Sequence, residues 1–255
     1  MTRRERTEQK MQLLFHSPAA GDEGTDGEFM QLLQGHIFGD LCWTGSLDDR
    51  MRELVTVTVL STLGTLPQLK AHVGAALNAG CTPVEIREAV YECAPFIGFP
   101  MTLNAIGAMN EVFTSQGIAL PLPKQGGDPA ERYERGLAVQ EPLYGDEIRE
   151  RYAWLPGPFA EAVPRALTEF CFGDYLSRGG LDTKTRELLI VVLLAALGGA
   201  EVQVKSHVAG ALKAGNSREE IVCALVHASA YMGMPRLFNA LNACKEVLCD
   251  KEEEK

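Results

Sequence analysis

The chain has 255 residues, and 46% of them are hydrophobic, which is enough to build one large core or two small ones. Its 34 acidic and 24 basic residues give a net charge of −10, and the basic residues form no continuous stripe, so nucleic acid is excluded as an expected partner. The longest apolar stretch, Leu188 to Ala200, is shorter than a membrane span of ~20 residues, and residues 1–15 are too charged for a signal peptide. We therefore expect a cytoplasmic protein that does not bind membranes.

Three helices are predicted in the first half of the chain. Asp48 can cap the first, and Gly64 can end it. Pro67 suits the first turn of the second helix, and Thr82-Pro83-Val84-Glu85 combines a cap, a proline and a glutamate at the start of the third. The predicted ranges are about 50–63, 67–80 and 83–93.

One segment in the first helix is ambiguous. Val55 to Val59 alternates β-branched residues, as a strand does. The equivalent segment in the second half, Leu189 to Leu197, is rich in leucine and alanine, so we interpret both as buried helices and predict an all-α fold.

A stretch rich in proline and glycine, residues 120–127, indicates a linker between two modules. We place the boundary near Gly126, which gives a first module of residues 1–126 with a core at 35–118. The second module then covers residues 127–255, with a core at 166–250.

The two modules are copies of one unit. The matching positions lie 134 residues apart at first, and 135 apart after an extra residue near Gly198. The matches include Phe38-Gly39-Asp40 with Phe172-Gly173-Asp174, Arg52-Glu53-Leu54 with Arg186-Glu187-Leu188, His72 with His207, Gly98-x-Pro100 with Gly233-x-Pro235, and Asn104-Ala105 with Asn239-Ala240. Helices as apolar as Leu188 to Leu197 must be covered on all sides, so we expect the copies to pack together and the chain to form a homo-oligomer.

A glutamate and a histidine recur inside the apolar helices of both copies. Glu53 precedes His72 by 19 residues, and Glu187 precedes His207 by 20. The short turn between the helices can bring each pair together, and a carboxylate that orients an imidazole is an acid/base arrangement. A buried pair that only fixes the packing of two helices is the alternative interpretation.

Further polar groups favour the second copy as the reactive one. His227 and Tyr231 share a helix face, and their counterparts in the first copy are Glu92 and Phe96. Arg186 and Arg236 could bind a substrate carboxylate there, with Arg52 as the equivalent in the first copy, although ordinary surface positions fit these arginines as well.

The seven cysteines are irregularly spaced and contain no Cys-x-x-Cys, and with five histidines they suggest neither a disulfide framework nor a metal site. Cys93 is a redox candidate, although its position beside Glu92 favours a buried, inert thiol.

Three runs of the second module resemble the 4-carboxymuconolactone decarboxylase family. They are Arg186 to Ile190, Ser206 to Gly215, and His227 to Pro235, with the lead-in Glu131 to Val139 and Leu143 to Asp146. Residues 127–250 thus resemble a full-length subunit, and residues 35–118 resemble a short, single-module member. This resemblance implies an alkylhydroperoxidase D-like helical module, present twice and packed as a pseudo-dimer.

The resemblance also implies a function. It implies a cofactor-free decarboxylase of 4-carboxymuconolactone, a lactone diacid of aromatic compound catabolism, or of a related lactone or keto acid. The protein would be assembled as an oligomer, for which we favour a trimer of tandem chains. In this chemistry His207 donates a proton or stabilises an oxyanion, Glu187 orients it, and the helix pair His227 and Tyr231 donates hydrogen bonds. Arg186 or Arg236 would hold a carboxylate.

The chain departs from the redox branch of the superfamily, whose Cys-x-x-Cys precedes the histidine. Thr65 and Gln68 occupy those positions in the first copy, and Ala200 and Gln203 in the second. Two alternatives to a decarboxylase stay open: a thiol redox or peroxide-stress enzyme that uses Cys93, and a non-catalytic ligand-binding protein.

Overall fold

The computed structural model describes residues 1–249, which form helices and loops and no strand. Residues 250–255, which close the predicted second module, lie outside the described residues. The helices of the first half are α1 (Arg3–Phe15), α2 (Gly27–Gln34), α3 (Asp49–Leu63), α4 (Leu66–Asn78), α5 (Pro83–Tyr91), α6 (Ala94–Ile97) and α7 (Phe99–Ser115), with η1 (Gly35–Asp40) and η2 (Leu41–Trp43) between α2 and α3. Those of the second half are η3 (Pro129–Glu131), α8 (Arg132–Tyr144), α9 (Glu147–Tyr152), α10 (Phe159–Ala166), η4 (Leu167–Leu176), α11 (Thr183–Leu197), α12 (Glu201–Lys213), α13 (Arg218–Met232) and α14 (Met234–Leu248).

The predicted caps begin the helices. The Asp48 side chain accepts a hydrogen bond from the Met51 amide at the start of α3, and Thr82 forms a capping box with Glu85 at the start of α5. Gly64 ends α3 with a φ of 69°, a left-handed conformation that glycine adopts without strain. The all-α prediction is therefore confirmed.

The ambiguous segment Val55 to Val59 is helical and lies within α3. All its side chains are fully buried, and the Thr56 hydroxyl is satisfied by donating to the Arg52 carbonyl one turn earlier. Burial on every side outweighs the weak preference of β-branched residues for strands.

The predicted third helix is shorter than expected in the first copy. It ends at Tyr91, and the short helix α6 follows, whereas α13 in the second copy continues to Met232. Pro95 stands where the second copy has Ala230, and a proline cannot donate the backbone hydrogen bond that would continue the helix.

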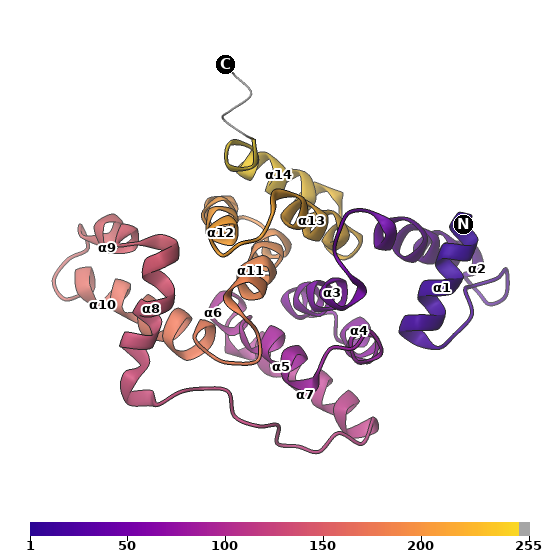
Figure 1. The fold of residues 1–255 in the computed structure, drawn as a ribbon, viewed down its shortest axis with the longest axis horizontal. Coiled ribbons are helices and arrows are strands. Elements are labelled where there is room, and N and C mark those ends of the chain that lie inside the picture. Colours follow the sequence, from indigo (N-terminus) through magenta and orange to yellow (C-terminus); the bar gives the residue numbers. More distant parts are fainter. Residues whose placement is uncertain (250–255) are drawn as a thin grey trace.

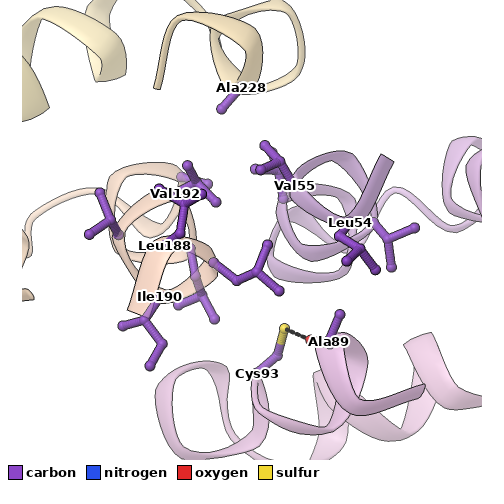
Figure 2. Close-up of a cluster of buried hydrophobic side chains, with 14 of the residues drawn as sticks. Leu54, Val55, Ala89, Cys93, Leu188, Ile190, Val192 and Ala228 are labelled. Carbon is purple, nitrogen blue, oxygen red and sulfur yellow. Dashed lines mark hydrogen bonds between the residues drawn. The ribbon is translucent and has the colours of Figure 1, made fainter. Parts of the chain in front are cut away.

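The centre of the molecule is formed by α3 and α11, which pack directly against each other (Figure 1). Both are almost wholly buried, with α13 on one side and α5 and α6 on the other. Figure 2 shows this core, in which Leu188 and Val192 of α11 face Val55 of α3, with Ala228 and Cys93 above and below. Each module therefore covers the apolar helix of the other, as in a dimer.

Helix α13 and the short helix α6, which follows the third helix α5, cross between the modules. Helix α13 of the second module packs on α3 of the first, and α6 of the first module packs on α11 of the second. Residues on these helices consequently reach the other module's central helix.

Each module also begins with an equivalent lead-in helix. In the first, α1 packs on η1 and Arg3 pairs with Asp40 at 2.7 Å; in the second, α8 packs on η4 and Arg132 pairs with Asp174 at 2.5 Å. The two lead-in helices lie at opposite ends of the molecule (Figure 1). Residues 116–128, which contain no helix, run from α7 to the second lead-in, and the boundary predicted near Gly126 falls there and stays a prediction.

A buried ion cluster joins the modules. Arg186 of α11 donates to Glu88 at 3.2 Å and to Glu92 at 2.9 Å, and Arg178 donates to Glu88 at 2.7 Å. Burial alone would raise the pKa of Glu88, but hydrogen bonds and charge from Arg178 and Arg186 hold it below its ordinary value. Glu88 is therefore a carboxylate that two arginines of the other module need.

We expect Glu88→Gln to lower the free energy of unfolding by about 3 kcal/mol, because it leaves buried Arg186 with only Glu92, whose pKa burial raises to about 8, as a partner. Urea unfolding measures this loss. The matched change Glu111→Gln removes an exposed ion pair with Lys70 and should cost less than about 1 kcal/mol. Equal losses in the two variants would contradict a role for Glu88 in joining the modules.

Candidate active site

Both predicted glutamate and histidine pairs form. His72 Nδ1 lies 2.8 Å from Glu53 Oε2, and His207 Nδ1 lies 3.0 Å from Glu187 Oε2. Each glutamate is on a central helix, α3 or α11, and each histidine is on the antiparallel helix that follows, α4 or α12. Because Nδ1 is held by the carboxylate, Nε2 is the nitrogen of each ring that is left for a ligand.

The second pair has a third member, Tyr144, from the end of lead-in helix α8. Its hydroxyl donates to Glu187 Oε2 at 2.5 Å and lies 2.8 Å from His207 Nδ1. Burial and the adjacent Glu187 carboxylate raise the pKa of Tyr144 well above its ordinary value, so the phenol stays protonated. Tyr144, Glu187 and His207 thus form one hydrogen-bonded group.

Gly210 of α12 makes room for the Tyr144 hydroxyl. A methyl group on Gly210 would lie 2.2 Å from that oxygen and 2.9 Å from Glu187 Oε2. At the equivalent place in the first module stand Phe15, which ends α1 as Tyr144 ends α8, and Ala75. The module with a tyrosine hydroxyl thus has a glycine facing it, and the module with phenylalanine, which lacks the hydroxyl, has room for an alanine.

A cavity of about 370 Å³ opens beside His207. This is within the range of small-molecule sites. Its walls come from both modules, mainly from α8, α9, η4 and α12 of the second and from α6 of the first. The residues that line it include Phe96, Tyr144, Arg151, Phe172, Ser206 and His207. His207 can therefore meet a ligand.

The first pair is enclosed by aromatic rings. The edges of Phe15 and Tyr231 lie against His72, with ring centroids 5.5 and 5.3 Å away, and His72 is only 7% exposed. Burial raises the pKa of Tyr231 far above its ordinary value, and its hydroxyl finds no hydrogen-bond partner within residues 1–249.

His227 also belongs to the first pair. Its Nε2 lies 3.0 Å from the Thr56 hydroxyl, which already donates its hydrogen to the Arg52 carbonyl, so Nε2 must carry the proton. Burial, helped by the charges of Arg52 and His72, lowers the pKa of His227 to about 3. The ring is neutral, and its Nδ1 is unpartnered within the described chain.

The prediction that His227 and Tyr231 join Glu187 and His207 is therefore wrong. They lie on α13, which crosses to the first module and places them beside Glu53 and His72. Their counterparts, Glu92 and Phe96, take the equivalent places near the second pair, and Phe96 packs edge-on against His207 at 6.0 Å. The two sites are thus composite, with residues from both modules.

Two of the three predicted carboxylate-binding arginines are buried in the structure. Arg186 is 1% exposed and is held by Glu88 and Glu92. Arg52 is 2% exposed and donates to the carbonyls of residues 41, 44 and 47. Arg236, on α14, does not line the cavity beside His207. Neither guanidinium is free to hold a substrate carboxylate, because Arg186 joins the modules and Arg52 holds the loop before α3 within its own module.

Cys93 is fully buried in the core, where its thiol donates to the Ala89 carbonyl (Figure 2). Burial and the neighbouring Glu92 raise the pKa of the thiol far above its ordinary value, which disfavours the thiolate that redox chemistry needs. Among residues 1–249, no group of three or more histidine, cysteine or acidic side chains is arranged to hold a metal ion. No helix in that range is long and apolar enough to cross a membrane.

Sequence reasoning missed Tyr144 and Arg151 as site residues. Tyr144 lay inside the lead-in Leu143 to Asp146, which contributed only to the family resemblance. A signal was present, because the start of α1, Arg3-x-Glu5-Arg6, matches Arg132-x-Glu134-Arg135 of α8 and marks a lead-in helix in both modules.

The family model for the carboxymuconolactone decarboxylase family matches residues 27–111 and 161–246, which together make up more than half of the chain. The chain belongs to this family. Its tandem arrangement agrees with the two matched regions, each of which contains one glutamate and histidine pair.

Two curated relatives of this chain are named as decarboxylases. A 4-carboxymuconolactone decarboxylase of Acinetobacter baylyi is 28% identical over 47% of this chain and 89% of its own length. Nitrosuccinic acid decarboxylase of Metarhizium robertsii is 29% identical over 46% of this chain and 82% of its own. A solved structure from Burkholderia xenovorans, provisionally described as a gamma-carboxymuconolactone decarboxylase subunit, shares the fold with a TM-score of 0.54 at 21% identity, over 95% of this chain and 97% of that one.

We expect Gly210→Ala to destabilise the protein by about 1–3 kcal/mol, because the added methyl group overlaps the Tyr144 hydroxyl. The loss should be smaller when the same change is made in a Tyr144→Phe background, since the shorter ring needs a smaller shift. A double-mutant cycle by urea unfolding measures this coupling. Gly74→Ala is the control, because nothing lies within 4 Å of its added methyl group, and it should be neutral or slightly stabilising. Additive losses at 144 and 210 would contradict the fit described for these residues.

The neutral state of His227 makes stability depend on pH. In the unfolded chain this ring takes up a proton near pH 6.5, whereas in the folded protein it does so near pH 3. Between these values the unfolded state binds more protons, so the folded state should lose about 1.4 kcal/mol for each unit by which pH falls. Buried Glu92, whose pKa is raised to about 8, contributes in the opposite sense and equally in both proteins, so the effect of His227 is read as a difference. On going from pH 7 to pH 5 in urea unfolding, the change in the free energy of unfolding should be about 2 kcal/mol more negative in the wild type than in His227→Gln. The same change in both proteins would show that His227 does not contribute.

Proposed function

We propose that the chain is a decarboxylase of a small carboxylate, with its active site at Tyr144, Glu187 and His207. The observation that carries this proposal is the cavity of about 370 Å³ beside His207, which meets a histidine already oriented by a buried carboxylate. The names of two relatives, both decarboxylases, support the reaction class. The homo-oligomer expected from the sequence stays a prediction.

The three residues have separate tasks in this proposal. Glu187 fixes the His207 ring through Nδ1, so that Nε2 faces the substrate. The Tyr144 hydroxyl donates to the same carboxylate oxygen and limits how far the pair can rotate. Phe96 covers one edge of the imidazole and keeps water away from it.

The chemistry requires little beyond this group when the substrate is an unsaturated lactone acid. The bond between the carboxylate and the ring breaks, carbon dioxide leaves, and the electron pair moves through the double bond to the carbonyl oxygen of the lactone. His207 then stabilises that oxygen or gives a proton to the carbon. The carbon chain gains the proton that replaces carbon dioxide, so the reaction needs no oxidant or reductant.

The first pair is the weaker candidate for catalysis. His72 is covered by Phe15 and Tyr231, and the neutral His227 beside it is fully buried. The redox alternative is disfavoured because Cys93 is enclosed in the core.

The test is an ultraviolet assay of decarboxylation with 4-carboxymuconolactone. His207→Ala should lower kcat/KM by about 100-fold or more, because it removes the acid/base group, while its unfolding midpoint stays close to that of the wild type. His72→Ala is the matched control and should keep activity within about threefold, since His72 is buried beneath Phe15 and Tyr231. Undiminished turnover by His207→Ala would overturn the site, and a folded wild type without turnover would overturn this substrate.

A further inference from the structure

The cavity beside His207 contains one arginine that none of the predictions used. Arg151 of α9 lines it together with Glu147, and the two side chains form an ion pair one helical turn apart. Arg151 is the one arginine among the residues that line the cavity, whereas Arg186 is enclosed between the modules. A cation facing an otherwise largely aromatic and aliphatic space requires an explanation.

The cationic character extends beyond Arg151. A neighbouring cavity of about 350 Å³ shares Tyr144, Glu147, Arg151 and Ser206 with the first and adds Lys205 and Lys213. Three basic side chains thus line this cavity with Glu147, in a chain whose net charge is −10. Lys205 pairs there with Glu246, and Lys213 donates to the Leu143 carbonyl.

The partner of Arg151 holds it weakly. The side chains of Arg151 and Glu147 are 43% and 57% exposed, and ion pairs at this spacing on an exposed helix contribute little. A carboxylate placed in the cavity can therefore exchange with the Glu147 carboxylate without a large loss, and a guanidinium can bind it through two parallel hydrogen bonds.

We propose that Arg151 is the specificity-determining residue of this site and that it binds a carboxylate of the substrate. When the site is empty, the Glu147 carboxylate pairs with Arg151 instead. The retained carboxylate of a diacid is the group that Arg151 would hold, because the lining contains no other arginine or lysine and Phe96, Phe172 and Leu176 offer the rest of the substrate apolar surface. A leaving carboxylate there loses its water without gaining a counter-charge, which favours its departure as neutral carbon dioxide. This inference rests on the proposed function for its reaction, but carboxylate binding can be measured without it.

The experiment compares benzoate with benzamide, which have the same ring and differ in charge, by calorimetric titration of the full-length protein. The wild type should bind benzoate more tightly than benzamide. Arg151→Gln should weaken benzoate binding about tenfold and leave benzamide unchanged, whereas Glu147→Gln should strengthen benzoate binding because it removes the competing carboxylate. Arg149→Gln is the matched control on the same helix, since Arg149 does not line this cavity, and it should change neither affinity.

Turnover of 4-carboxymuconolactone gives the second readout, in which Arg151→Gln should raise KM about tenfold and change kcat less than threefold. A preference for benzoate that depends on Arg151, in a protein without turnover, would support the carboxylate site while the proposed reaction fails. Equal benzoate affinities in the wild type and Arg151→Gln would overturn the role of Arg151 even if the decarboxylase is active.

Discussion

The structure depends on two helices, α3 and α11, that are buried along almost their whole length and are covered only by both modules together. Each is buried by the other and by a helix of the other module, α13 for α3 and α6 for α11, which cross between the modules. Burial of such helices supplies the main favourable free energy for packing the halves together. The same crossing brings residues of one module to the glutamate and histidine pair of the other, so the packing of the core decides the composition of both sites.

Equivalent positions in the two sites are occupied by different residues that fit one another within each site. The end of the lead-in helix has Phe15 in one and Tyr144 in the other, and the facing position has Ala75 or Gly210. Helices α13 and α6 reverse the aromatic pattern, with Tyr231 at the first site and Phe96 at the second. Each histidine therefore has one tyrosine and one phenylalanine beside it, but the tyrosine comes from the other module at the first site and from the same module at the second. Within the described residues, the tyrosine forms a hydrogen bond to the glutamate and histidine pair only at the second site.

The local structure was predictable from sequence because it depends on neighbours in the chain. Caps such as Asp48 and Thr82 define where helices begin, and the spacing of Glu53 to His72 across one turn predicts their contact. The surroundings of His227 were not predictable, because periodicity shows which face of α13 it occupies but not which module that face meets. Arg186 was misassigned for the same reason, since its partners Glu88 and Glu92 lie about 95 residues away in sequence. The site assignment itself stays a prediction.

A tandem chain also changes what one mutation can do. In a symmetric dimer of identical subunits, a substitution on the third helix alters both sites at once. Here Ala228 and Cys93, or His227 and Glu92, are separate codons, so each site can vary while the other keeps its chemistry. The fusion of two copies therefore allows one site to lose access to ligand and serve the core, while the other evolves toward a substrate of its own.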